Sequence, residues 1–163
     1  VKVPKSNLLG EEEKGFRVAM STLDGGRIGI AAQALGIAEA AFRYAKYYSK
    51  ERVQFGSPIS SLQAIQFMLA DMSTRIAAGR HLVISSSYKK DEQKDYGLES
   101  AQAKVFCSEA AMWIATKAIQ VCGGNGFTTE YPVERYFRDA KITEIYEGTS
   151  EVQRIVIAAK ELK

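Results

Sequence analysis

The stretch Arg27–Phe42, "RIGIAAQALGIAEAAF", decides the fold class of the chain. After the opening arginine, only Gln33 and Glu39 interrupt a run of apolar and small residues that covers nearly every face of a helix. A helix of this kind is expected to be buried on all sides, and its glycines and alanines let neighbouring helices approach closely. The stretch therefore predicts an all-α protein with this helix in the middle of a bundle.

The rest of the chain indicates further helices separated by short connections. The first helix is expected over residues 16–52, with the Gly25–Gly26 pair as a place where it could kink, and Gly56 and Pro58 end it. The other helices are expected at residues 60–88, 98–121, 133–140 and 151–162. Three long helices and a fourth with short connections are typical of an antiparallel four-helix bundle, here with a short extra helix.

The first residues of the chain have a different pattern. Val1–Pro4 alternates like the last residues of a strand before a proline, and a charged connection follows. Because a lone strand end needs a sheet, we expect residues 1–15 to be the tail of an upstream β-domain and its connector. Residues 16–163 are then the helical domain.

Composition limits the classes of function. At 163 residues, with 46% apolar and 25% charged residues, the chain has the make-up of one globular domain. A net charge of +3 without a Lys/Arg-rich block argues against nucleic acid as a partner. Cys107 and Cys122 have no CxxC motif and no nearby histidine, and the single His81 is expected to be exposed or satisfied on a helix, so no metal site is predicted. No apolar run is long enough to span a membrane.

Several motifs have both an ordinary structural interpretation and a ligand-binding one. "GGNGF" (residues 123–127) follows a helix, which excludes a Rossmann phosphate loop and leaves a helix C-cap or a backbone bare enough for a ligand. Arg52, at a helix end, either complements the helix dipole or binds a phosphate. Gln63 is a surface amide or a cofactor contact, and Asp24 with Arg27 is a surface ion pair or part of a ligand site.

Glu147 presents a similar choice within "TEIYEGTSEVQR", Thr143–Arg154. Ser150 to Gln153 fits an S-x-x-Q capping box, with Ser150 as the N-cap and Gln153 reaching back from the third helical position. Glu147 lies three residues before that cap and takes no part in the box. It is either a residue of the helix terminus or a group that accepts a proton.

Four segments of the chain together resemble one known family. They are "LDGGRIGIAAQALGIA", "ERVQFGSPISSLQAIQFMLADM", "AIQVCGGNGFTTEYPVERYFRDAKI" and "EIYEGTSEVQRIVIA". In this order they resemble the C-terminal domain of the acyl-CoA dehydrogenases, and most of all the short-chain, butyryl-CoA type. The resemblance covers the chain from Phe16 onward, and "VKVPKSNLLGEEEKGF" looks like the exit from that family's middle β-domain.

The resemblance implies a reaction and a catalytic base. The reaction is FAD-dependent α,β-dehydrogenation of a short-chain acyl-CoA to the trans-2-enoyl-CoA, with electrons passed to an electron-transfer flavoprotein. The family's base lies in the motif IYEGT, which here is Glu147; one branch carries its base before the arginine of LD-x-x-R instead, where this chain has Gly26. A carboxylate must meet the α-carbon while the flavin faces the β-carbon, so positioning does much of the catalysis.

The resemblance also implies the other site residues and the partners. Asp24, Arg27 and Gly148 correspond to substrate contacts. The FAD contacts correspond to Arg52, Gln63, Gln120, Val121, Cys122, Gly123, Gly124, Thr149, Ser150 and Glu151. In the family, those at 52, 63 and 120–124 reach the FAD of a neighbouring subunit, so a homo-oligomer is expected, a tetramer built as a dimer of dimers. The expected location is the bacterial cytoplasm, or the mitochondrial matrix in a eukaryote.

Two alternatives remain beside this reading. The 163 residues could form only a helical assembly module that is inactive in isolation, because the family's other two domains supply most of the flavin and acyl pockets. The same fold could also belong to an acyl-CoA oxidase, which passes its electrons to oxygen.

Overall fold

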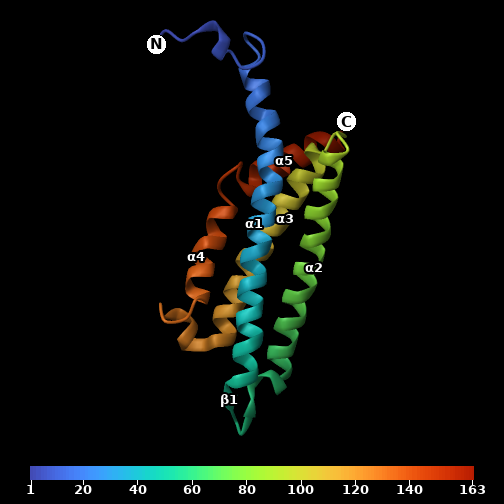
Figure 1. Ribbon diagram of the computed structural model, residues 1–163. Helices are drawn as coiled ribbons and strands as arrows, with labels where there is room; N and C mark the ends of the chain where they lie inside the picture. Colours follow the sequence, from blue (N-terminus) through green and yellow to red (C-terminus); the bar gives the residue numbers. More distant parts are fainter.

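The computed structural model describes residues 1–163 and is almost entirely helical (Figure 1). The predicted all-α class is confirmed. The helices are α1 (Gly15–Glu51), α2 (Gln63–Asp91), α3 (Gly97–Cys122), α4 (Val133–Thr143) and α5 (Ser150–Glu161). The shorter elements are three 3-10 helices (Lys5–Asn7, Ile59–Ser61 and Gly123–Phe127) and the strands β1 (Val53–Gln54) and β2 (Ser57–Pro58).

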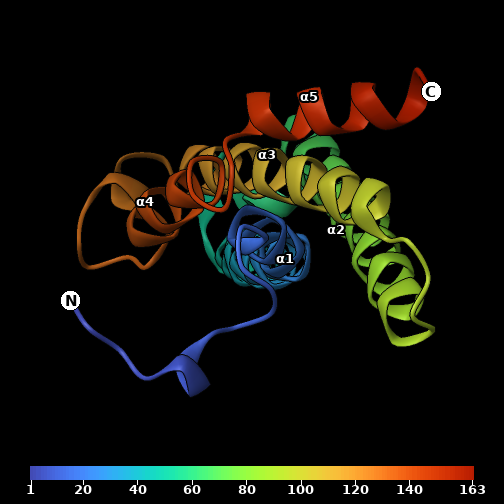
Figure 2. The same ribbon diagram turned by 90° about the horizontal axis from the view of Figure 1, so that it is seen from above.

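The central helix of the bundle is α3, and not the helix that contains Arg27–Phe42. Viewed along the bundle, α3 lies between α1 and α5, with α2 and α4 on its two sides (Figure 2), and it contacts all four. In α1 only one stripe is buried, while Gly29, Ala32 and Gly36 are exposed. The prediction of a fully buried first helix was therefore wrong. Alanine and glycine have so little apolar side-chain surface that a helix face made of them can remain exposed to water.

The buried stripe of α1 fixes how closely α1 and α3 approach. Its five alanines are each at most 1% exposed, at the three- and four-residue spacing of one helix face. They are Ala31, Ala34, Ala38, Ala41 and Ala45. The buried residues of α3 are also mostly small, and both rows belong to one core cluster. Short side chains on both helices let the two backbones pack tightly, so there is little room for a larger residue.

Details of the helix boundaries differ from the sequence prediction. The first helix continues through Gly25–Gly26 without a break. Its connection to α2 contains a two-stranded hairpin with Val53 opposite Pro58, which the sequence analysis missed. Phe55 and Gly56 at its tip both have positive φ, as a tight hairpin turn requires.

Residues 1–14 project from the bundle and are all exposed (Figure 1). Strand hydrogen bonds need a neighbouring strand, and β1 and β2 lie at the opposite end of the molecule. The strand end predicted at Val1–Pro4 is not formed here. The only regular structure of this segment is the 3-10 helix at Lys5–Asn7.

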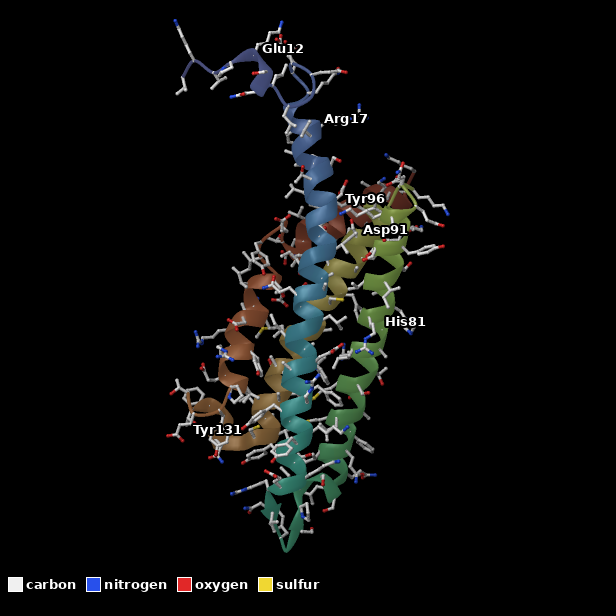
Figure 3. All side chains as sticks on the ribbon, viewed as in Figure 1. Glu12, Arg17, His81, Asp91, Tyr96 and Tyr131 are labelled. Carbon is white, nitrogen blue, oxygen red and sulfur yellow. The ribbon has the colours of Figure 1, made fainter.

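The remaining sequence features take simple places in the fold. His81 lies exposed on the outer surface of α2 (Figure 3). Cys107 and Cys122 are free and buried, and burial raises the pKa of Cys107 to about 12 and that of Cys122 to about 11. None of the helices combines the length and the apolar character that crossing a bilayer requires.

The tight α1–α3 contact predicts an asymmetric response to added volume. Ala38→Leu should lower the free energy of unfolding by about 1–3 kcal/mol, because three carbon atoms must enter a closely packed contact. Ala32→Leu, on the exposed face of the same helix, should change it by less than about 0.5 kcal/mol. Urea unfolding of the two variants measures the difference, and equal losses would contradict the packing described above.

Candidate active site

Glu147 lies in the short turn that joins α4 to α5, and the backbone there is unusual. Glu147 has φ 56° and Gly148 has φ 89°, so two consecutive residues adopt left-handed conformations. Glycine does so freely, but for glutamate such a conformation costs roughly 1–3 kcal/mol and persists only where surrounding contacts impose it. The reversal of the chain directs the Glu147 side chain back towards α1.

The Glu147 carboxylate lies against bare backbone of α1. A Cβ atom added at Gly26 would fall 2.5 Å from Glu147 Oε2 and 3.1 Å from its Cδ, so any larger residue at Gly26 would have to displace the carboxylate. Glu147 is half-buried, and its Oε2 is buried without a hydrogen-bond partner. The carboxylate is thus held in place by shape and not by hydrogen bonds, and its buried oxygen stays without a partner.

Side chains from α3 and α5 hold the two carbonyl groups of this turn. The amide Nε2 of Gln153 donates to the carbonyl oxygens of Glu147 and Gly148, both at 3.0 Å. Lys104 of α3 donates through Nζ to the Gly148 carbonyl oxygen at 2.8 Å. The preceding residue is tied to α1, because the Tyr146 hydroxyl donates to Gln33 Oε1 at 2.6 Å.

The helix cap beside the turn is placed one residue earlier than predicted. The N-cap of α5 is Thr149, whose Oγ1 accepts from the Val152 backbone N–H at 3.4 Å, and Ser150 is the first helical residue. Gln153 does not reach back to an N–H group; it donates to the turn instead. The capping box at Ser150 was therefore wrong, because the left-handed turn presents carbonyl oxygens where the motif expects an N–H.

Unpartnered polar atoms gather at this site. The buried side-chain nitrogen and oxygen atoms without a hydrogen-bond partner are Arg27 Nε, Glu147 Oε2, Ser150 Oγ and Gln153 Oε1. Most buried polar atoms in native proteins are paired, so each exception calls for a reason. Their concentration around the turn and the adjoining part of α1 marks the place where the chain can offer polar groups to a ligand.

Two charged residues of this region are buried in the bundle. Arg27 is 6% exposed, and its Nη1 donates to Asp24 Oδ1 at 2.6 Å, so the predicted Asp24–Arg27 pair flanks Gly26 beside Glu147. Lys104 is 0% exposed and pairs with no carboxylate. Burial lowers the pKa of Lys104, and nearby carboxylates, led by Glu144, partly offset this.

A second site lies at the other end of α1, beside the hairpin. Its pocket of about 270 Å³ is lined by Tyr48, Arg52, Gln54, Ile59, Val121, Cys122, Gly123, Gly124 and Asn125. Added Cβ atoms at Gly123 and Gly124 would meet nothing within 4 Å, so the backbone is open there. Arg52 is exposed and forms no ion pair. A free guanidinium beside an uncovered backbone suits a phosphate-bearing ligand.

The structure thus divides the predicted cofactor residues between two places. Arg52 and residues 121–124 line the pocket near the hairpin, with Gln63 and Gln120 exposed outside its lining. Thr149, Ser150 and Glu151 line a separate pocket of about 260 Å³ at the start of α5. Arg52, the C-cap of α1, follows Gly26 by 26 positions, or about 39 Å of helix.

Sequence reasoning missed three residues whose hydrogen bonds tie the α4–α5 turn to α1 and α3: Lys104, Gln33 and Tyr146. A signal for Lys104 was present, because it lies among small residues at helical spacing with Ser100, Ser108 and Ala111, all of them buried. A lysine within a small-residue stripe indicates a buried cation. Nothing local marks Gln33 or Tyr146, whose contact joins positions 113 residues apart.

Fold and site together define an all-α domain in which the turn between α4 and α5 holds a half-buried carboxylate with an unpartnered buried oxygen. Residues 13–162 match the family described as "Acyl-CoA dehydrogenase, C-terminal domain". The chain belongs to the acyl-CoA dehydrogenase family, and the resemblance found in its sequence is confirmed.

Individual relatives agree with this assignment. The chain is 58% identical over 156 residues to "Acyl-CoA dehydrogenase, short-chain specific" from Megasphaera elsdenii, a match that covers 96% of the chain and 41% of the relative. The solved butyryl-CoA dehydrogenase of Megasphaera elsdenii has a TM-score of 0.99 at 56% identity, over 100% of this chain and 43% of that one. A chain in a structure described as "Electron transferring flavoprotein of Acidaminococcus fermentans" has a TM-score of 0.98 at 58% identity, over 99% and 42%. The chain thus spans about two fifths of the length of these relatives.

The close approach at Gly26 generates a paired prediction. Gly29→Ala, where an added Cβ meets nothing within 4 Å, should raise the free energy of unfolding by about 0.5–1 kcal/mol through helix propensity. Gly26→Ala should gain less, because its Cβ must push the Glu147 carboxylate aside. Chemical denaturation of both variants, with a crystal structure of Gly26→Ala, checks this. Equal gains and an unmoved carboxylate would show that Gly26 does not shape the site.

Proposed function

We propose that this chain carries the catalytic base of an FAD-dependent acyl-CoA dehydrogenase, and that the whole protein oxidises a short-chain acyl-CoA to the trans-2-enoyl-CoA. One observation carries the proposal: the half-buried Glu147 carboxylate faces bare backbone at Gly26 and keeps one buried oxygen without a partner. Family membership and the short-chain names of the similar proteins support it. The 163 residues alone are proposed to be inactive.

In this mechanism Glu147 accepts the α-proton of the thioester. Its carboxylate is held at one position by the left-handed turn, so little reorganisation is needed when the proton is transferred. Bound FAD would supply the acceptor for the hydride that leaves the β-carbon. The backbone N–H of Glu147 makes no hydrogen bond within the chain, so it is a donor that can stabilise the developing charge on the thioester oxygen.

Most of the proposed FAD contacts line the two pockets, and Gln63 and Gln120 lie outside both linings. Arg52 and the open backbone of Gly123 and Gly124 would hold a phosphate-bearing part of the cofactor. Thr149, Ser150 and Glu151, at the start of α5, would lie beside the FAD of the same subunit. The distance between the pockets supports an arrangement in which one end of each subunit serves a neighbour's cofactor, as in the tetramer expected from the family.

The proposed substrate contacts surround the base. Gly148 follows Glu147, and Asp24 and Arg27 flank Gly26 on α1. The electron acceptor is proposed to be an electron-transfer flavoprotein, supported by the structure in which a similar chain occurs under that description. The cytoplasmic or mitochondrial-matrix location remains a prediction.

The role of Glu147 predicts the effect of removing its basic carboxylate. In the full-length protein, Glu147→Gln should keep FAD and acyl-CoA binding, because the side-chain shape and the Thr149 cap are retained. Reduction of the flavin by butyryl-CoA should fall by at least about 10²-fold, the low end for a positioned general base. Stopped-flow absorbance follows the reduction, and Glu134→Gln, which changes a half-buried glutamate paired with the exposed Arg138 on α4, is the matched control. A Glu147→Gln enzyme that reacts at the wild-type rate would refute the assignment.

Arg52 offers a separate test of cofactor binding. Arg52→Ala in the full-length protein should weaken FAD retention more than folding, since a charge-assisted bond to phosphate contributes about 1.5–3 kcal/mol. An exposed cation at a helix end contributes only about 0.3–1 kcal/mol. Flavin content after gel filtration and the melting temperature are measured together, with Arg43→Ala on the same helix as control. Unchanged flavin content with a lower melting temperature would leave only the helix-dipole role.

A further inference from the structure

The buried ammonium group of Lys104 has no part in the chemistry proposed above. Lys104 is the largest of the fully buried side chains, at 0% exposure. A lysine is rarely placed so deep, because removing its charge from water is costly unless a specific interaction compensates. No carboxylate forms an ion pair with it, so the usual compensation for a buried lysine is absent.

The interaction that Lys104 makes is directed at the turn beside the base. Its Nζ donates to the carbonyl oxygen of Gly148 at 2.8 Å, across 44 residues of sequence. A hydrogen bond from a charged donor is roughly twice as strong as one between neutral groups. The buried charge of Lys104 therefore strengthens a hydrogen bond to the peptide that follows Glu147.

The conformation of that peptide has to be fixed by contacts from outside the turn. Gly148, at φ 89°, has the conformational freedom of glycine, and its rotation would release the left-handed conformation of Glu147 at φ 56°. Gln153 holds the same carbonyl at 3.0 Å and the Glu147 carbonyl at 3.0 Å. Lys104 and Gln153 together fix both peptide planes of the turn, and with them the direction in which the Glu147 side chain leaves the backbone.

We propose that Lys104 is a positioning residue for the proton-accepting carboxylate of Glu147, acting through the Gly148 carbonyl in concert with Gln153. This inference rests on the proposed function of Glu147. Lys104 forms no hydrogen bond with the carboxylate; it fixes the peptide that sets the position of the carboxylate. A role confined to folding would be visible in stability and cofactor content, whereas positioning appears in the rate of the proton-transfer step.

The test uses Lys104→Met in the full-length, FAD-loaded protein. Methionine keeps an unbranched chain of similar volume and removes the ammonium, while Gln153 still satisfies the Gly148 carbonyl. We expect the melting temperature, flavin content and KM for butyryl-CoA to stay near wild type. The rate of flavin reduction per bound flavin should fall at least about tenfold, because misplacing a reacting group by about 1 Å can cost about 100-fold. Lys117→Met on the same helix, beside Trp113, is the control and should react at the wild-type rate.

A second variant separates positioning from a general defect. Gln153→Leu removes the other donor to the same turn, and the rate loss of the double variant should differ from the product of the two single losses, since both act on one carbonyl. A crystal structure of Lys104→Met should show the Glu147 carboxylate displaced from Gly26.

Three outcomes would overturn the inference. Lys104→Met could reduce flavin at the wild-type rate, it could fail to assemble or load flavin, which would assign Lys104 to folding, or its losses could multiply independently with those of Gln153→Leu. Glu147→Gln, measured in parallel, separates the two proposals. If Glu147→Gln is inactive while Lys104→Met is unaffected, only the role of Lys104 fails; if Glu147→Gln is active, the proposed function fails.

Discussion

The Glu147 carboxylate can occupy its position only because α1 has no side chain at Gly26. A Cβ atom at that position would lie 2.5 Å from Glu147 Oε2. The rest of the bundle keeps the two elements at that separation. The alanine stripe fixes α1 against α3, α3 carries the lysine that holds the Gly148 carbonyl, and α5 contributes Gln153 to the same turn. A change of a few tenths of an ångström in any of these contacts is transmitted to the carboxylate, because closely packed interiors do not absorb it.

One helix connects the two ends of the proposed chemistry. Gly26 lies near the base, and Arg52, about 39 Å further along α1, lines the pocket with open glycine backbone. A rigid helix holds that distance constant, which suits a protein in which one subunit supplies both a base and contacts to a neighbour's cofactor. The buried polar groups without partners occur around the proposed base, and the rest of the core is largely apolar or hydrogen-bonded.

The sequence was sufficient to predict the helices and to single out Glu147 as a candidate base, and insufficient where contacts between distant residues decide the structure. Periodicity located all five helices to within a few residues, since the core faces repeat locally. It could not identify α3 as the central helix, because glycine and alanine tolerate both burial and exposure, as Ala38 and Ala32 on α1 illustrate. The cap at Thr149 depends on the left-handed turn before it, and the proposed function of Lys104 depends on a carbonyl 44 residues away. Neither has a local pattern.

Moving the carboxylate between the two facing positions tests the central claim most directly. In the full-length protein, Glu147→Gly suits the left-handed backbone and removes the base, and Gly26→Glu then places a carboxylate on α1 in the space that is vacated. If carboxylates at positions 26 and 147 face the same substrate atom, the double variant should reduce flavin with butyryl-CoA at least about tenfold faster than Glu147→Gly alone. A positioned base contributes about 10²–10⁴-fold to the rate. A double variant no faster than Glu147→Gly, with FAD and acyl-CoA both bound, would contradict the account.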